Sequence, residues 1–194
     1  MACLYNAAVS GAPPDDIKVG STTTRVRDFV NRDPEFDELY VHPPTLRACC
    51  RVIGQPFKLS TMHARTLRPR TAAQRLHVDF PRDVRGWPMT GFIFMIDDFT
   101  PHNGATCFLP GSQGMDTPPA LSSLVPACGR SGSVIVFNGS VWHGHGPNRT
   151  DTARRSIQGA YIRRTETSGE SLASRMRPET LDRIGPVAKY LLTV

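Results

Sequence analysis

The chain has 194 residues, of which 39% are hydrophobic, so one domain with a single core is expected. No stretch approaches the roughly 20 apolar residues of a membrane-spanning helix, and the first residues lack the regions of a signal peptide. The net charge of +6 comes mainly from scattered arginines, so neither a membrane nor a nucleic acid is an expected partner.

The five cysteines are an odd number and show no C-x-x-C spacing. This pattern favours reduced thiols in the cytoplasm over a disulfide framework. The adjacent pair Cys49-Cys50 fits two thiols packed in a helix better than a redox site. Nothing in the sequence indicates the oligomeric state.

The N-terminal third predicts helices rather than strands. Residues 1–20 show little periodicity and predict a mobile N-terminal segment, followed by a single domain over residues 21–194. A short helix is expected over residues 24–31. A second helix is expected from Pro43 to Gly54, because proline suits a first turn and glycine suits a helix end.

From Phe57 onward the pattern is that of short strands separated by turns rich in glycine and proline. A long loop is expected over residues 115–130 and a terminal helix over residues 178–192. Such strands and turns indicate a mainly β fold, the double-stranded β-helix (cupin-like jelly roll), with flanking helices. The expected strands are residues 57–67, 75–80, 90–96, 105–109, 133–137 and 156–163.

The sequence Leu76 to Phe80 predicts a strand that carries a histidine and an aspartate on one side. Side chains alternate along a strand, so His77 and Asp79 project in the same direction. A second imidazole is available from His143, which follows a distant apolar run. Two imidazoles and one carboxylate on one face hold non-haem Fe(II) and leave three positions open. The alternative for the H-x-D pattern alone is a solvated pair on an edge strand.

A candidate carboxylate clamp follows the second histidine. Arg154 comes shortly after His143. An oxygenase that uses 2-oxoglutarate has to hold the far carboxylate of that cosubstrate, and the guanidinium fork matches both carboxylate oxygens. The chain therefore supplies three ligands and a clamp in a workable order.

Several separated motifs occur around these residues. They include Asn103-Gly104-Ala105-Thr106, the Leu109–Gln113 turn, the Gly132–Gly139 strand and the Trp142–Arg149 segment. In this order they resemble the phytanoyl-CoA dioxygenase family, over about residues 55–165. The resemblance implies a jelly-roll dioxygenase that depends on Fe(II), 2-oxoglutarate and O2. It also implies oxidation of a C–H bond of a small-molecule substrate, with bacterial secondary metabolism as the expected context.

Carried over to this chain, the resemblance makes His77, Asp79 and His143 the iron ligands. Asp79 argues against halogenation, because halogenating relatives replace this aspartate by a small residue. Two positions depart from the family's pattern. His145 stands where relatives often carry a small residue, and Val78 stands where many carry glutamine or arginine.

The resemblance also assigns residues to the cosubstrate. Arg154 becomes the anchor for the far carboxylate of 2-oxoglutarate, and Thr106 contributes a hydroxyl to the same pocket. Gln74 resembles a glutamine that some relatives use there. Strand parity places Gln74 off the ligand face unless a bulge intervenes.

Other interpretations remain open from the sequence. A cupin-like metal enzyme, either an isomerase or a dioxygenase without 2-oxoglutarate, would use the same three ligands and would not need Arg154. A non-catalytic binding module that kept the barrel is a third interpretation, against which the intact ligands argue. His63, on the strand before the site, is a weaker candidate for lining the pocket. The sequence does not separate hydroxylation from desaturation, cyclisation or epimerisation.

Overall fold

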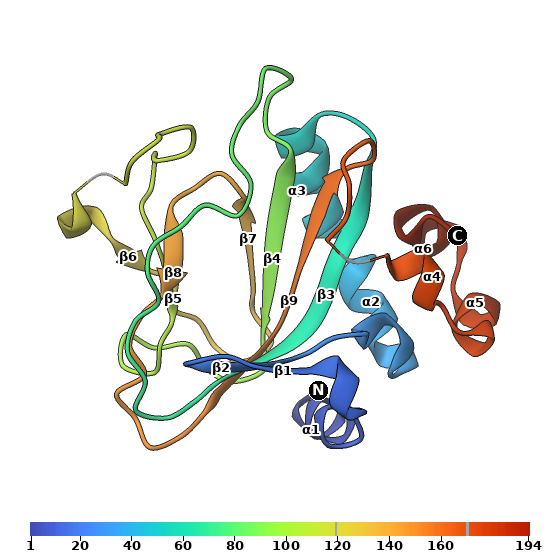
Figure 1. Ribbon diagram of the computed structural model, residues 1–194, viewed down its shortest axis with the longest axis horizontal. Helices are drawn as coiled ribbons and strands as arrows, with labels where there is room; N and C mark the ends of the chain where they lie inside the picture. Colours follow the sequence, from blue (N-terminus) through green and yellow to red (C-terminus); the bar gives the residue numbers. More distant parts are fainter. Residues whose placement is uncertain (119, 170) are drawn as a thin grey trace.

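The computed structural model describes residues 1–118, 120–169 and 171–194, and its strands form two antiparallel sheets (Figure 1). The smaller sheet has the order β6 (Val125–Pro126), β5 (Thr106–Phe108) and β8 (His143–His145). The larger sheet has the order β1 (Ile17–Val19), β2 (Thr23–Val26), β3 (Phe57–Leu67), β9 (Arg154–Arg163), β4 (Met89–Met95) and β7 (Val134–Asn138). This architecture confirms the mainly β jelly roll.

Helices flank the larger sheet on the side away from the smaller sheet (Figure 1). Among the described residues, no helix has the length and apolar character needed to cross a bilayer. The helices are α1 (Ala2–Ser10), α2 (Asp37–Tyr40), α3 (Pro43–Ile53), α4 (Leu172–Arg175), α5 (Pro178–Arg183) and α6 (Pro186–Leu192). Short 3-10 turns cover Pro14–Asp16, Phe29–Asn31, Pro34–Phe36 and Leu121–Ser123.

The strand β4 is buried on both faces because it lies between the helices and the smaller sheet. Phe94 and Ile96 belong to the main apolar cluster, which includes side chains from the helices. Ile93 and Met95 point the other way and pack with Ala105, next to β5. The predicted buried strand over residues 90–96 is thereby confirmed, and α3 packs directly against it.

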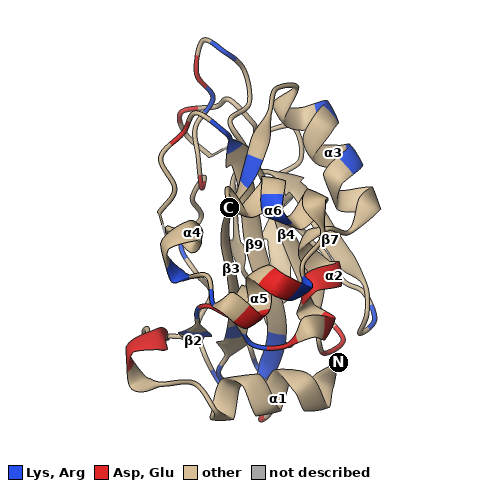
Figure 2. Cartoon of the chain, turned by 90° about the vertical axis from the view of Figure 1, so that its right-hand side faces the viewer, with Lys and Arg blue, Asp and Glu red and all other residues tan. Residues whose placement is uncertain are grey.

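The helical face carries charges of both signs. Figure 2 looks onto this face and shows acidic residues on α2 and α5 and basic residues on α3. The helix α3 was predicted correctly, and Gly54 ends it with a φ of 64°, a left-handed conformation that glycine adopts without strain. The predicted terminal helix is in fact two helices, α5 and α6, because Gly185-Pro186 interrupts it.

The segment over residues 1–20, predicted as mobile, contains a helix. Residues 2–10 form α1, and Tyr5 on this helix is only 1% exposed. The Tyr5 hydroxyl shares a hydrogen bond of 2.9 Å with Thr66 Oγ1, and its ring lies 6.1 Å from that of Phe29. One buried aromatic anchors a helix whose sequence shows little amphipathic pattern.

The short helix expected over residues 24–31 is wrong. Residues 23–26 form β2, which pairs in register with the end of β3. Its threonines and valine are β-branched and fit a pleated surface better than a helix. This pairing brings Arg25 directly opposite Arg65.

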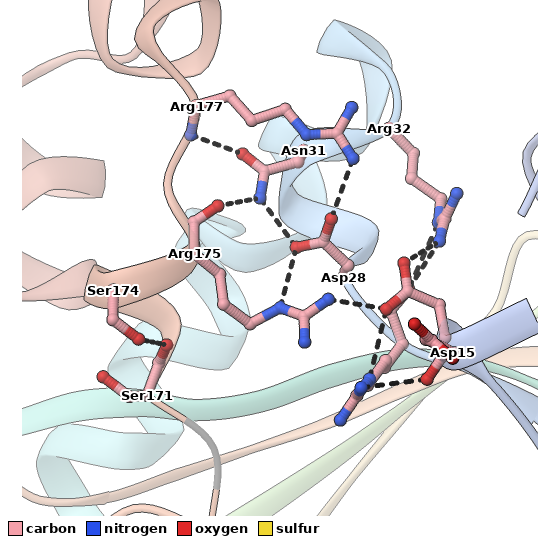
Figure 3. A network of polar contacts seen from close by, with 10 residues as sticks. Asp15, Asp28, Asn31, Arg32, Ser171, Ser174, Arg175 and Arg177 are labelled. Carbon is pink, nitrogen blue, oxygen red and sulfur yellow. Dashed lines mark hydrogen bonds and ion pairs between the residues drawn. The ribbon is translucent and has the colours of Figure 1, made fainter. Parts of the chain in front are cut away.

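A network of ion pairs ties the C-terminal segment to the N-terminal one (Figure 3). Arg175 pairs with Asp16, and Arg177 Nη2 lies 3.1 Å from Asp28 Oδ2. The Asn31 side-chain amide donates to the carbonyl of Arg175 over 2.9 Å. Burial would raise the pKa of Asp16, but hydrogen bonds from its arginine partners outweigh it and lower that pKa. The charged carboxylates therefore hold the two ends of the described chain together.

Candidate metal centre

A cavity of about 300 Å³ lies between the two sheets. One wall consists of residues from β2, β3, β4, β7 and β9 of the larger sheet, and the other of residues 74, 77 and 79, β5 and β8. This volume is at the lower end of the range for small-molecule sites, which is about 300–1,000 Å³. The cavity therefore suits small ligands.

Three side chains that the sequence predicts as metal ligands meet in this cavity. The ligand atoms of His77, Asp79 and His143 all lie within 4.8 Å of one another. The Nε2 atoms of His77 and His143 lie 3.5 Å and 3.4 Å from the two carboxylate oxygens of Asp79. Within the described residues, this is the one group of three or more such side chains close enough to share an ion.

The backbone explains how these residues converge. The amide of each histidine donates to the carbonyl of the other, over 3.0 Å from His77 and 2.9 Å from His143. The strand predicted over residues 75–80 is wrong in part, because this pair is an isolated bridge. The amides of Asp79 and Phe80 both donate to the carbonyl of Gly139 instead, so the pairing with β8 does not continue. The alternation of His77 and Asp79 is nevertheless kept.

The ring orientation of both histidines suits metal binding. The Nδ1 of His77 lies 3.1 Å from the carbonyl of Arg75, and the Nδ1 of His143 lies 2.9 Å from that of Val141. A carbonyl can only accept, so each Nδ1 carries the hydrogen and each Nε2 presents its lone pair. Two such nitrogens beside one carboxylate are the donor set that non-haem Fe(II) takes, so the residues fit this ion.

Without a metal ion, protons on the Nε2 atoms take its place and make the hydrogen bonds to Asp79, and metal binding releases such protons. Burial would raise the pKa of Asp79, but hydrogen bonds from His143 and His77 outweigh it and hold the pKa well below its usual range. The hydrogen bond with Asp79 raises the pKa of His77. Asp79 is thus a carboxylate at neutral pH, and its side chain is still 31% exposed. A cation arriving in the cavity meets a charged and accessible ligand.

Two further predicted residues line the same cavity. Thr106 is buried on β5, in register with His145 on β8. Gln74 lines the cavity although strand parity placed it elsewhere, because its segment is not a continuous strand and parity does not apply. The Gln74 side-chain oxygen accepts a hydrogen bond of 3.1 Å from Arg65.

His145 lines the cavity but does not join the metal ligands. Its Nε2 lies 3.1 Å from Thr22 Oγ1, and its Nδ1 lies 2.8 Å from the carbonyl of Gly146. Burial lowers the pKa of His145 to about 4, so the ring is neutral. It therefore ties the turn between β1 and β2 to β8 rather than adding a fourth ligand.

Arg154 is buried and is not among the residues that line the cavity. Its Nη2 donates to the carbonyl of Gly104 over 2.9 Å, and its guanidinium stacks 4.0 Å over the ring of Phe99. It is 1% exposed, and its Nε has no hydrogen-bond partner. Burial, and then the charge of Arg65, lower the pKa of Arg154 to about 9. Arg154 is thus close to the wall without being among the residues that line it.

The sequence analysis missed two cations that line the cavity, Arg25 on β2 and Arg65 on β3. Arg65 donates to the side-chain oxygens of Gln74 and Gln158 over 3.1 Å and 3.2 Å. Burial, and then the charge of Arg25, lower the pKa of Arg65 to about 10. The signal was the inward-facing row of β3, in which an arginine follows His63 by two positions. His63 itself lines the cavity, as the sequence suggested.

The family model described as phytanoyl-CoA dioxygenase (PhyH) matches residues 3–156. Among curated proteins, the chain is 29% identical over 201 residues to dioxygenase sphC of Aspergillus fumigatus, covering 93% of this chain and 54% of sphC. It is also 29% identical over 150 residues to the uncharacterized protein Rv1501 of Mycobacterium tuberculosis, covering 71% of this chain and 55% of that one. The chain thus spans about half the length of these relatives.

Solved structures share the fold at low sequence identity. HygX from Streptomyces hygroscopicus, with nickel and 2-oxoglutarate bound, has a TM-score of 0.70 and 17% identity, covering 88% of this chain and 82% of HygX. The non-haem α-ketoglutarate-dependent epimerase SnoN from nogalamycin biosynthesis has a TM-score of 0.69 and 18% identity, covering 84% of this chain and 71% of SnoN. At these identities the likeness is one of fold.

We expect the substitution Asp79→Ala to weaken Ni²⁺ binding by about a hundredfold or more. Mutation of a residue that only hydrogen-bonds to a metal ligand already lowers metal affinity about 10–100-fold, and Asp79 is itself a ligand. Titration calorimetry on metal-free protein measures this. Asp182→Ala removes an exposed carboxylate from α5 and serves as the matched control, with binding unchanged. Equal binding by wild type and Asp79→Ala would remove Asp79 from the centre.

Proposed function

Because the chain belongs to the phytanoyl-CoA dioxygenase family, we propose that it is an Fe(II)- and 2-oxoglutarate-dependent dioxygenase that oxidises a C–H bond of a small molecule. The family depends on Fe(II), 2-oxoglutarate and O2. The observation that carries the proposal is the meeting of His77, Asp79 and His143 in one cavity, with both Nε2 atoms facing the carboxylate.

In this proposal His77, Asp79 and His143 hold the iron. When bound, the iron supplies the activation of O2, and 2-oxoglutarate supplies the reducing electrons as it loses carbon dioxide. The chain's own contribution is to position the ligands and to keep water from the reacting atoms. The apolar side chains of Phe137 and Ile93 on the cavity wall serve this second role.

The far end of 2-oxoglutarate needs a cation, and we propose that Arg154 provides it. Arg154 is close enough to His145 for its charge to contribute to the lowered pKa of that ring, and His145 lines the cavity. The buried Nε of Arg154 has no hydrogen-bond partner, and a carboxylate could accept its hydrogen. Thr106 and Gln74 would contribute a hydroxyl and an amide to the same pocket.

Arg154 is not among the residues that line the cavity, and this favours one alternative function. A cupin-like metal enzyme, either an isomerase or a dioxygenase that does not use 2-oxoglutarate, would need the three ligands and no clamp. Release of succinate separates the two functions, because only the first converts 2-oxoglutarate.

We place the substrate among small molecules of secondary metabolism. The size of the cavity supports a small substrate, and a structure of HygX from Streptomyces hygroscopicus contains hygromycin B. The curated relatives include fungal dioxygenases, so a bacterial context rests on the sequence alone. A cytoplasmic location is consistent with all five cysteines being free.

The direct test is release of succinate from 2-oxoglutarate by protein loaded with Fe(II) in the presence of O2. We expect wild type to release succinate even without its substrate, slowly, and Asp79→Ala to release none, since the iron loses its carboxylate ligand. The control Asp182→Ala should match wild type. Release by Asp79→Ala at the wild-type rate would show that the ligand assignment is wrong.

A second test concerns the clamp. We expect Arg154→Gln to weaken 2-oxoglutarate binding about 10- to 100-fold, which corresponds to about 1.5–3 kcal/mol for a hydrogen bond to a charged group. Binding of 2-oxovalerate, which lacks the far carboxylate, should change little. Calorimetry on nickel-loaded protein measures both. If Arg65→Gln weakens 2-oxoglutarate and Arg154→Gln does not, the anchor is Arg65 instead.

A further inference from the structure

The cavity has a cationic corner that the metal centre and the cosubstrate clamp do not explain. It consists of Arg25 on β2 and of His63 and Arg65 on β3. Arg25 and Arg65 are direct partners in the β2–β3 register. His63 comes two positions before Arg65, so its side chain projects to the same side of β3. All three line the cavity that holds the metal ligands.

The positive charge of this corner has no acidic partner in direct contact. Within the described residues, no ion pair or hydrogen bond involves the side chain of Arg25. The Nη atoms of Arg65 donate to the neutral amides of Gln74 and Gln158, and its buried Nε has no partner. Asp79 is the acidic group that acts on Arg65, and the two metal-binding histidines already engage it. Like charges directly opposite each other on neighbouring strands destabilise a sheet.

The imidazole of His63 adds an unsatisfied polar atom. Its Nε2 is buried and has no hydrogen-bond partner. Burial, and then the charges of Arg25 and Arg65, lower the pKa of His63 to about 3, so the ring is neutral. A buried polar atom without a partner is rare in a folded protein, and on a cavity wall it can receive a hydrogen bond from a bound molecule.

We propose that Arg25 and His63, with Arg65 beside them, bind the primary substrate, and that this substrate is a small organic anion. Its charged oxygens meet the Arg25 guanidinium at the exposed edge of the cavity, and a hydroxyl or amino group bonds to His63 Nε2. The inference rests on the proposed function, because the metal centre is what would oxidise the bound molecule.

The geometry gives this subsite a separate place from the clamp. Arg154 is buried on β9, next to Gly104 and Phe99, whereas Arg25 is exposed on β2. An anion at Arg25 therefore enters from solvent after the cosubstrate has taken the buried end. The cavity of about 300 Å³ holds both molecules only if the substrate is small.

The charge requirement is tested by calorimetry on nickel-loaded protein saturated with 2-oxoglutarate, which does not turn over. The probes are 3-hydroxybutanoate and its uncharged amide. Wild type should bind the acid at least about tenfold more tightly than the amide, as expected for a charge-assisted pair. Arg25→Gln should abolish this preference. The matched control Arg47→Gln, an exposed arginine on α3, should keep it.

The hydrogen bond to His63 is tested with a third probe, butanoate, which lacks the hydroxyl. His63→Leu should bind 3-hydroxybutanoate and butanoate equally, whereas wild type prefers the hydroxy acid. The charge preference should survive this substitution. If wild type does not distinguish acid from amide, or does not bind the acid, the proposal is wrong.

Before the probes are added, the protein is titrated with 2-oxoglutarate. This titration shows whether the corner binds the carboxylate of the cosubstrate or that of the substrate. If Arg25→Gln weakens 2-oxoglutarate itself, the corner serves the cosubstrate and the proposal is overturned. If wild type does not bind 2-oxoglutarate in the presence of nickel, the proposed function fails instead. That failure is visible before any substrate probe is added.

Discussion

Two backbone hydrogen bonds between His77 and His143 are the constraint on which the site depends. They join segments that are far apart in sequence and set two imidazoles with their centroids 4.6 Å apart. Side chains alternate along an extended chain, so Asp79, two positions after His77, projects to the same side and its carboxylate lies beside both rings. The larger sheet faces this pair across the cavity, since its inner face supplies the opposite wall.

The charge of the cavity is uneven, and this asymmetry connects the structure to its chemistry. The described lining contains one carboxylate, Asp79, and two guanidinium groups, with Arg154 nearby. A divalent metal would occupy the carboxylate and leave the arginines to face incoming anions. Such an arrangement costs stability in the empty protein and fits a site that binds acidic molecules beside a cation.

The sequence predicted most of the fold because the strands from β3 onward alternate or are continuously apolar. It failed where one contact overrides the local pattern, as Tyr5 does for α1 and the pairing with β3 does for residues 23–26. The three ligand residues followed from alternation and chemistry. Arg65 shares its strand face with His63, but it was missed because the sequence does not show which face of that strand meets the cavity until the neighbouring strands are known.

The measurement closest to the central claim is the visible absorption of protein loaded with Fe(II) and 2-oxoglutarate in the absence of O2. A 2-oxo acid that chelates ferrous iron gives a charge-transfer band, so wild type should develop one that saturates at one equivalent of iron. Asp79→Ala should develop none. Binding of both components to wild type without such a band would contradict a shared site at His77, Asp79 and His143.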